Sequence, residues 1–239
     1  MIVTAIIPAA GIGNRMGGKI QKQFLNLNNK PIIAHTLLKF QMCEIVNNVY
    51  LIVPPDKIEH CKNDIVQRYK LTKVIDVVEG GKERQDSVYN GFKKVDPKTD
   101  IIVIHDGVRP FVTEEIIRES IHAVKEYGAV VAAVPEKDTI KEVSDDFKVG
   151  KTLNRRLLWR IQTPQVFKRE ILERAFKRAI EDGYYGTDEA SLAERAGYPV
   201  RVVWGSDFNI KITTPEELII GNAILNYMNL STQSKLKGP

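Results

Sequence analysis

The sequence predicts an α/β protein with a mostly parallel β-sheet that is covered by helices on both faces. Three observations predict this class. Short β-branched runs recur along the chain, segments with helical periodicity lie between them, and a glycine-rich loop follows the first run. Strands of a parallel sheet are buried on both faces, so near-continuous apolar runs that alternate with helical segments favour that architecture.

Six runs have the composition of buried strands. Their β-branched residues favour extended backbone, and few polar residues interrupt them. They are residues 3–7, 49–53, 74–78, 101–104, 129–134 and 200–204. In parallel sheets of this kind, ligands bind beyond the carboxyl ends of the strands, so the loops after these runs are the expected site.

Three intervening segments place apolar residues with helical i, i+4, i+7 spacing. These residues are Ile33, Leu37 and Phe40, then Val88, Phe92 and Val95, and then Ile117, Ile121 and Val124. Thr113 is a plausible N-cap for the third helix. Thr214-Pro215-Glu216-Glu217 combines a capping box with proline at the first helical position, so it predicts the start of another helix.

Residues 138–155 break this alternation. Two short strand-like runs, 139–143 and 148–153, flank a turn and are too polar for a core hairpin. An isolated two-stranded ribbon is only marginally stable, so we expect this β-arm to project and to pack on a second subunit. Residues 1–230 are expected to form one domain, followed by a disordered tail over 231–239.

The composition describes an ordinary globular protein. Of 239 residues, 43% are hydrophobic and 27% are charged, and the net charge is +5. The cations are dispersed among acids without an aromatic and basic stripe, which argues against a nucleic-acid partner.

Cys43 and Cys61 lack metal-ligand or disulfide spacing and indicate a reducing compartment. No signal peptide and no apolar stretch of roughly 20 residues is present, so we expect a cytoplasmic protein without membrane contact.

The loop after the first run has the features of a phosphate-binding loop. Its small residues from Ala9 to Gly13 free backbone N–H groups for an anion, and Arg15 and Lys22 add two cations. Met16 replaces the third glycine of a dinucleotide fingerprint, and the Gly-Lys-Ser/Thr of a Walker A loop is absent. The loop therefore suits a triphosphate that is attacked at its α-phosphorus, although a simple tight turn remains an alternative reading.

Two further loops carry candidate ligands. Gly80 and Gly81 would let the backbone pack against a flat base, and Ser87 would hydrogen-bond a pyrimidine edge; a plain glycine turn before a helix is an equal alternative. Asp106 ends the fourth run, where a carboxylate can hold Mg²⁺ on triphosphate oxygens, with Arg109 suited to a second phosphate. The alternative role of Asp106 is a helix cap. We expect His105 to be hydrogen-bonded in the core.

Five more short motifs complete the pattern: Thr139-Ile140-Lys141, Asn154-Arg155-Arg156, Gln162-Thr163-Pro164-Gln165, Thr187-Asp188-Glu189-Ala190 and Asn209-Ile210-Lys211. Together the segments resemble the 2-C-methyl-D-erythritol 4-phosphate cytidylyltransferases of the non-mevalonate isoprenoid pathway, from Ile6 to about Leu218. The resemblance implies a three-layer, Rossmann-like nucleotidyltransferase fold and a homodimer. It also implies Mg²⁺-dependent transfer of CMP from CTP to the polyol phosphate, with release of pyrophosphate.

The resemblance also implies roles for individual residues. Arg15 and Lys22 would stabilise charge on the phosphates, and Asp106 would serve Mg²⁺ and the substrate. The implied CTP ligands are Ala9, Ala10, Gly11, Gly13, Gly81 and Ser87. The implied ligands of the polyol phosphate are Arg109, Thr187 and Lys211, together with Asp106 and with Thr139 and Arg155 from the arm. Arg155 and Lys211 join Arg15 and Lys22 as the catalytic set.

Some positions depart from the family pattern, and two other functions stay open. Gly107-Val108 follows Asp106 where alanines are usual, and Asn154 replaces a frequent aspartate. Phe208 stands where an acidic residue often precedes Asn-Ile-Lys, which leaves Asp207 as a doubtful second metal carboxylate.

A ribitol 5-phosphate cytidylyltransferase is the nearest alternative function, but the segment 84–88 and Trp159 resemble the isoprenoid branch. The second alternative is a non-catalytic nucleotide-binding regulator, which would not need groups for a departing pyrophosphate.

Overall fold

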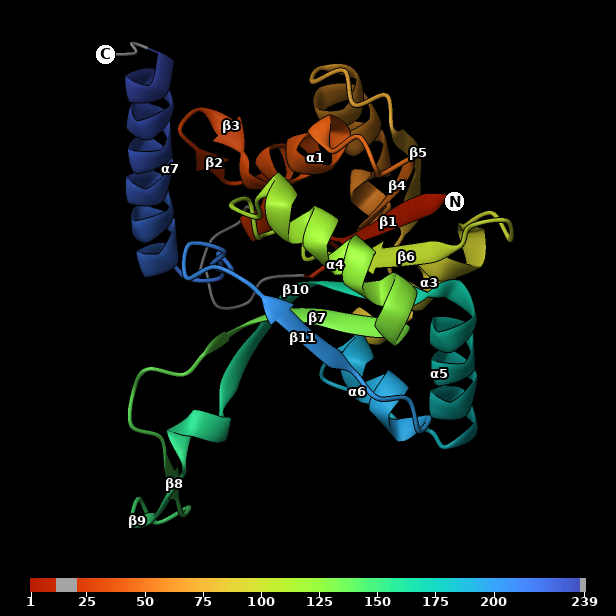
Figure 1. The fold of residues 1–239 in the computed structure, drawn as a ribbon. Helices are drawn as coiled ribbons and strands as arrows, with labels where there is room; N and C mark the ends of the chain where they lie inside the picture. Colours follow the sequence, from red (N-terminus) through yellow and green to blue (C-terminus); the bar gives the residue numbers. More distant parts are fainter. Residues whose placement is uncertain (12–20, 237–239) are drawn as a thin grey trace.

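A computed structural model describes residues 1–11 and 21–236 of the chain (Figure 1). In these residues a central sheet contains seven strands in the order β11-β7-β10-β6-β1-β4-β5. The strands are β1 Val3–Pro8, β4 Asn48–Val53, β5 Val74–Glu79, β6 Ile101–Ile104, β7 Ala129–Pro135, β10 Trp159–Lys168 and β11 Arg201–Trp204. Each of the six predicted strands is therefore present, with ends that differ by at most one residue.

β10 is a strand that the sequence interpretation missed. It runs antiparallel to β6 and β7, whereas β1, β4, β5, β6, β7 and β11 form parallel pairs. Its pairing with β7 is irregular between Ile161 and Gln165, the stretch that contains Pro164. Proline lacks the N–H donor that a ladder needs, so this polar, proline-containing stretch resembles a turn in the sequence.

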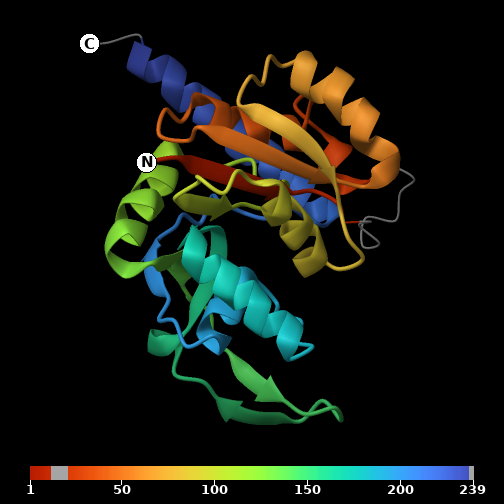
Figure 2. The same ribbon diagram turned by 90° about the vertical axis from the view of Figure 1, so that its right-hand side faces the viewer.

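Helices cover both faces of the sheet, as the periodicity predicted (Figures 1 and 2). In β1 the alternate residues Val3, Ala5 and Ile7 pack on one side and Ile6 on the other. α1 Ile32–Met42 and α4 Glu114–Tyr127 bury their apolar residues on the first side. α3 Arg84–Lys94, α5 Arg169–Glu181 and α6 Glu189–Arg195 pack on the second. Burying one such aliphatic side chain contributes about 1.5–3 kcal/mol, so this double core holds the strand ends in place.

The predicted helix starts are confirmed. The Thr113 hydroxyl accepts a hydrogen bond from the N–H of Ile116 at 3.2 Å. Thr214 and Glu217 form a reciprocal capping box at the start of α7 Pro215–Leu236. α7 passes residue 231, where we expected a tail to begin, because the sequence has no helix-breaking glycine or proline between residues 222 and 237.

A smaller apolar cluster joins α7 to the body of the molecule. Phe111, Ile212 and Ile224 pack there with Leu27. Leu27 belongs to β2 Asn26–Leu27, which pairs with β3 Lys30–Pro31. The N–H of Ile212 donates to the carbonyl of Val108 at 2.9 Å. This packing fixes the position of the neighbouring residue Lys211.

The remaining short elements are single turns at Lys22–Phe24, Pro55–Lys57 and Arg155–Leu157. α2 Ile58–His60 continues into a wider helical turn at Cys61–Gln67.

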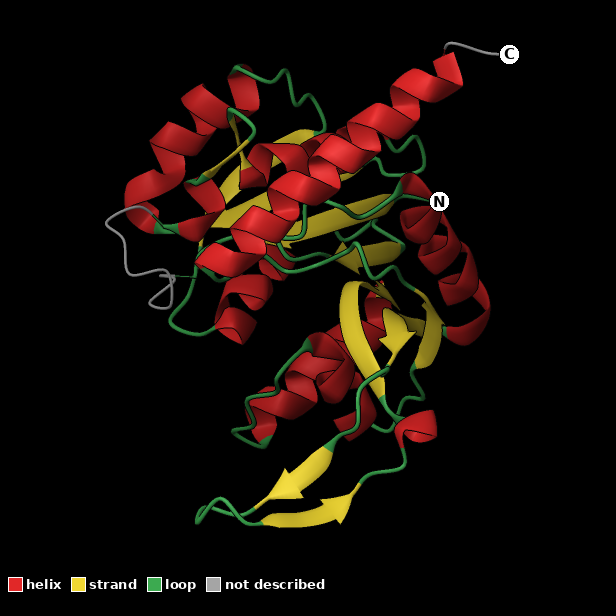
Figure 3. Ribbon diagram, turned by 90° about the vertical axis from the view of Figure 1, so that its left-hand side faces the viewer, coloured by secondary structure: helices red, strands yellow, loops and turns green. Residues whose placement is uncertain are grey.

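The predicted ribbon is present as β8 Lys141–Val143 and β9 Val149–Thr152, an antiparallel pair that projects from the body (Figures 1 and 3). All of its strand residues are exposed, and Phe147 between the strands is 90% exposed. We call residues 138–155 the arm. In the described part of the chain, no helix has the length and apolarity needed to span a membrane.

Candidate functional site

A cavity of about 660 Å³ lies beyond the carboxyl ends of β1, β4, β5 and β6. This is the position that the parallel sheet predicted. The described residues that line it come from six segments of the chain. They are Pro8, Ala9, Ala10, Gly11, Lys22, Gln23, Pro54, Pro55, Gly80, Gly81, Lys82, Glu83, Arg84, Ser87, Asp106, Val108 and Lys211. The structure thus brings eight of the predicted site residues to one cavity.

The first wall of the cavity is the chain that leaves β1. The N–H of Ala9 donates to the carbonyl of Ile52 at 2.7 Å, and the buried Gln23 amide donates to the carbonyl of Ala9, also at 2.7 Å. These two bonds hold Ala9 and its neighbours Ala10 and Gly11 at the cavity surface. Lys22, which begins the turn Lys22–Phe24, also lines the cavity. Gly13 and Arg15, which belong to the same predicted loop, lie outside the described residues.

The second wall is the loop between β5 and α3. A Cβ on Gly80 would lie 2.3 Å from the Ala10 Cβ, so only glycine allows the two walls to approach this closely. The Gly81 N–H donates to the Ser87 hydroxyl at 3.0 Å, and that hydroxyl donates to the Glu83 carbonyl at 3.1 Å. Ser87 therefore shapes the loop. Among the described hydrogen bonds, none uses the carbonyl oxygens of Gly80 and Gly81.

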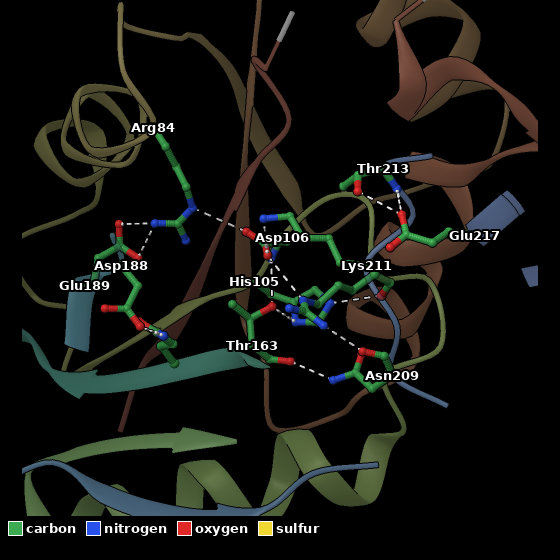
Figure 4. Close-up of polar contacts among 12 residues, drawn as sticks. Arg84, His105, Asp106, Thr163, Asp188, Glu189, Asn209, Lys211, Thr213 and Glu217 are labelled. Atoms are coloured by element: carbon green, nitrogen blue, oxygen red, sulfur yellow. Dashed lines mark hydrogen bonds and ion pairs between the residues drawn. The ribbon is translucent and has the colours of Figure 1, made fainter. Parts of the chain in front are cut away.

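Asp106 lies at the floor of the cavity, directly after β6, and is only 6% exposed (Figure 4). Its Oδ1 lies 3.4 Å from Arg84 Nε, and its Oδ2 lies 3.3 Å from Arg109 Nε and 3.1 Å from Lys211 Nζ. Burial alone would raise the pKa of Asp106. The attraction of Arg84, Lys211 and Arg109 outweighs burial and holds this pKa well below its usual range, so the carboxylate is charged.

His105 is the buried, hydrogen-bonded residue that the sequence predicted. The Thr163 hydroxyl accepts from the N–H of Asp106 at 3.0 Å, so its own proton is available to His105 Nδ1, also at 3.0 Å. His105 Nε2 then donates to the carbonyl of Arg109 at 3.0 Å. Burial lowers the pKa of His105 to about 4, so the ring is neutral. This network supports the backbone on both sides of Asp106.

Arg84 and Glu189 form a pair that the sequence interpretation did not include in the site. Arg84 Nη1 lies 2.8 Å from each carboxylate oxygen of Glu189, which is 1% exposed. Burial alone would lower the pKa of Arg84, but Glu189 and Asp106 outweigh it and raise this pKa, so Arg84 is charged. A sequence signal existed, because a cation in the first turn of a helix opposes the helix dipole and needs a specific partner.

Four predicted residues do not line the cavity. Arg109 lies behind Asp106, where its Nη1 donates to the carbonyl of Asn209 at 2.7 Å. Thr187 is exposed in the loop before α6, and Asp188 rather than Thr187 caps that helix. Thr139 and Arg155 are exposed in the arm, where Arg155 Nη1 donates to the Lys137 carbonyl at 2.9 Å. Of the residues expected to bind the polyol phosphate, Asp106 and Lys211 therefore line the cavity, whereas these four do not.

In the described part of the chain, the doubtful second metal carboxylate does not lie beside Asp106. Asp207, the doubtful candidate, pairs instead with Lys137 and with Arg160 Nη2 at 2.7 Å, and it does not line the cavity. Over residues 1–11 and 21–236, no three His, Cys, Asp or Glu side chains gather as a metal-binding group.

A cavity with glycine-rich walls, a charged carboxylate and several cations, at the carboxyl ends of parallel strands, defines a nucleotide-binding protein of the nucleotidyltransferase class. The family model for 2-C-methyl-D-erythritol 4-phosphate cytidylyltransferase (IspD) matches residues 3–227. The chain belongs to this family and is a cytidylyltransferase of the non-mevalonate route to isoprenoids. The predicted resemblance is thereby confirmed.

Individual relatives agree with the family match. The 2-C-methyl-D-erythritol 4-phosphate cytidylyltransferase of Syntrophus aciditrophicus is 50% identical over 223 residues, which cover 93% of this chain and 95% of the relative. That of Alkaliphilus metalliredigens is 49% identical, with 94% and 93% covered. The crystal structure of 4-diphosphocytidyl-2C-methyl-D-erythritol synthase from Anaerococcus prevotii superposes with a TM-score of 0.83 at 33% identity, covering 94% of this chain and 96% of the other. The α/β fold with its projecting arm is that of the family.

Proposed function

We propose that this cavity transfers CMP from CTP to 2-C-methyl-D-erythritol 4-phosphate, giving 4-diphosphocytidyl-2-C-methyl-D-erythritol and pyrophosphate. One observation carries the assignment of the site. Glycine-containing walls, the cation Lys22, and the charged pair of Asp106 and Lys211 line the same cavity. Base, triphosphate and acceptor can therefore meet in one place.

In this proposal, the phosphate of the acceptor attacks the α-phosphorus of CTP in line. The attacking group is already an anion, so the step needs no general base, and catalysis consists of positioning and electrostatic stabilisation. Lys22 and Arg15 stabilise charge on the triphosphate as pyrophosphate departs. Ala9, Ala10, Gly11, Gly13, Gly81 and Ser87 form the CTP site. The carbonyl oxygens of Gly80 and Gly81 accept no hydrogen bond from the described residues, so they suit the 4-amino group of cytosine.

Asp106 is the residue that would hold Mg²⁺. It is ionised, lines the cavity, and its ion pairs of 3.1–3.4 Å are longer than tight charge-assisted bonds of about 2.8 Å, so an oxygen can be shared. Mg²⁺ commonly binds one or two carboxylates together with substrate phosphates, which fits a single aspartate here. The ion would neutralise charge on the phosphates of CTP.

The acceptor site is completed by the arm of a second subunit. In its own subunit, the arm leaves Thr139 and Arg155 exposed, and neither lines the cavity. The arm also exposes Phe147 and Val149, by 90% and 65% respectively, and such apolar residues favour a protein partner. A twofold homodimer would use the arm twice, adding Thr139 and Arg155 to Arg109, Thr187 and Lys211 around the polyol phosphate.

The test is pyrophosphate release by the purified protein from CTP and 2-C-methyl-D-erythritol 4-phosphate, with and without Mg²⁺. We expect turnover that needs both substrates and is lost when EDTA removes the cation. Faster turnover with ribitol 5-phosphate would assign the protein to the alternative acceptor. Binding of CTP without any pyrophosphate release would support a non-catalytic regulator instead.

A further inference from the structure

Three consecutive residues at the start of α3 hold the loop that connects α5 to α6. Gln85 Nε2 donates to the carbonyl of Tyr184 at 3.1 Å, and Gln85 Oε1 accepts from the N–H of Gly186 at 2.9 Å. On either side of Gln85, Arg84 pairs with Glu189 and Asp86 accepts from the hydroxyl of Tyr185 at 3.1 Å. We call Arg84, Gln85 and Asp86 the clasp, and residues 184–189 the acceptor loop.

The acceptor loop carries Thr187, and the residues next to it are held on both sides. Gly186 is held by Gln85, while the Asp188 carboxylate accepts from the Gln165 side chain at 2.7 Å. The loop is also tightly packed, because a Cβ on Gly186 would lie 2.3 Å from the Ser191 hydroxyl. The position of Thr187 is therefore determined by bonds that do not involve Thr187 itself.

The following residue of α3, Ser87, faces the other substrate. Its hydroxyl holds Gly81 in the wall of the cavity assigned to cytosine. Gln85 does not line the cavity, whereas Arg84 does and also contacts Asp106. The start of α3 thus contacts both regions. Arg84 and Asp86 contact the nucleotide cavity or its wall as well as the acceptor loop. Both side-chain hydrogen bonds of Gln85, in contrast, go to the acceptor loop.

We propose that Gln85, the central residue of the clasp, positions the acceptor loop and thereby determines affinity and selectivity for the polyol phosphate, but not for CTP. The proposal rests on the proposed function, since it takes Thr187 as a ligand of the acceptor. Gln85 is a positioning residue, because it acts on the acceptor through the backbone of the loop. Its two bonds to Tyr184 and Gly186 fix the backbone directly before Thr187.

The decisive variant is Gln85→Met, which keeps the length of the side chain and removes both hydrogen bonds. We expect the KM for 2-C-methyl-D-erythritol 4-phosphate to rise about tenfold, since a loop that must be ordered on binding weakens affinity. The KM for CTP should stay within about twofold of the wild type. The ratio of kcat/KM for 2-C-methyl-D-erythritol 4-phosphate over ribitol 5-phosphate should also fall, because a looser loop discriminates less between polyols.

A matched control lies on the same helix. Asn90 donates to the Glu79 carbonyl at 3.3 Å, away from the acceptor loop, so Asn90→Ala should change neither KM. Tyr185→Phe removes only the exposed bond to Asp86 and should raise the acceptor KM about twofold. If Gln85→Met does not fold, Gln85→Glu carries the same comparison of the two KM values, because it keeps the oxygen that accepts from Gly186 and removes the donor to the Tyr184 carbonyl.

The outcomes separate the two proposals. Equal changes in the KM values for CTP and acceptor, or no change in either, would overturn the role of the clasp while leaving the proposed reaction intact. A wild-type protein that does not turn over CTP with this acceptor would overturn both. A selective rise in the acceptor KM in Gln85→Met, absent from Asn90→Ala, would establish the clasp.

Discussion

The cavity and the arm are built in opposite ways. Asp106 in the cavity is 6% exposed and has three cationic neighbours, each from a different part of the same chain. Arg155 at the root of the arm is exposed and bonds only a nearby carbonyl in the described structure. The described part of one chain therefore gives Asp106 a complete set of charged neighbours. In our proposal, the arm residues gain a comparable environment from a second subunit.

This difference follows from what surrounds each region. Two cores, one on each face of the sheet, hold the loops that form the cavity. The strands of the arm bury none of their residues, and a free ribbon of this length is only marginally stable. The proposed division of labour is that each subunit binds its own CTP while the partner's arm helps to hold the acceptor. The following predictions test it, in order of decreasing effect.

Lys22→Ala should have the largest effect, because it removes a cation from the cavity where charge develops on the departing pyrophosphate. We expect kcat to fall about a hundredfold or more, with a smaller rise in the KM for CTP. Steady-state kinetics of pyrophosphate release measure both quantities. Lys93→Ala, on the far end of α3, is a matched control that should leave both unchanged. Near-normal kcat with weaker CTP binding would make Lys22 a ground-state ligand only.

Replacement of CTP by UTP should have the next largest effect. The carbonyl oxygens of Gly80 and Gly81 can accept a hydrogen bond from the 4-amino group of cytosine. Uracil has a 4-oxo group instead, so the two carbonyl oxygens would have no donor and would be repelled by the partial negative charge of the 4-oxo oxygen. We expect kcat/KM to be at least about a hundredfold lower for UTP. Comparable values for the two nucleotides would show that these carbonyls do not read the base.

Complementation between Arg155→Ala and Lys22→Ala tests whether the arm acts on the partner's site. If Arg155 acts in trans, a mixed dimer contains one site with both defects and one with neither. Random exchange makes about half of the dimers mixed, so about a quarter of the sites recover. Mass spectrometry of tagged chains should first confirm the exchange. A fully exchanged mixture that is as inactive as its parents would falsify the shared site.

The sequence predicted the body of the fold well because its signals there are local. β1 and α4 follow from apolar residues a few positions apart, and the capping box before α7 lies within four residues. β10 lacked such a signal. Its register is determined by two neighbouring strands, β6 and β7, and its polar and proline residues resemble a turn. A strand that depends on tertiary pairing is not visible in its own composition.

The candidate site likewise contains some residues that the sequence located and others that it did not. The glycine walls and Asp106 could be located because each directly follows a predicted strand. The pair of Arg84 and Glu189 joins residues 105 positions apart, so no spacing rule connects them. Sequence patterns therefore identified the residues that follow strand ends. They did not identify the residues that hold those loops against one another.

The smallest expected effect is that of Phe147→Ala in the arm on stability, judged against a phenylalanine of the core. Phe176 is 1% exposed in the core between α3 and α5, whereas Phe147 in the arm is 90% exposed. Phe176→Ala should lower the free energy of unfolding by about 3–5 kcal/mol, since it removes a buried ring and leaves a cavity. Phe147→Ala should change the same quantity by less than about 0.5 kcal/mol at concentrations where the chain is monomeric, because it loses no internal contact. Urea unfolding measures both, and sedimentation should show weaker self-association for Phe147→Ala alone. If Phe147→Ala destabilised the monomer as much as Phe176→Ala does, the arm would have to pack on its own body, and the proposed contrast between a self-sufficient cavity and a partner-dependent arm would be wrong.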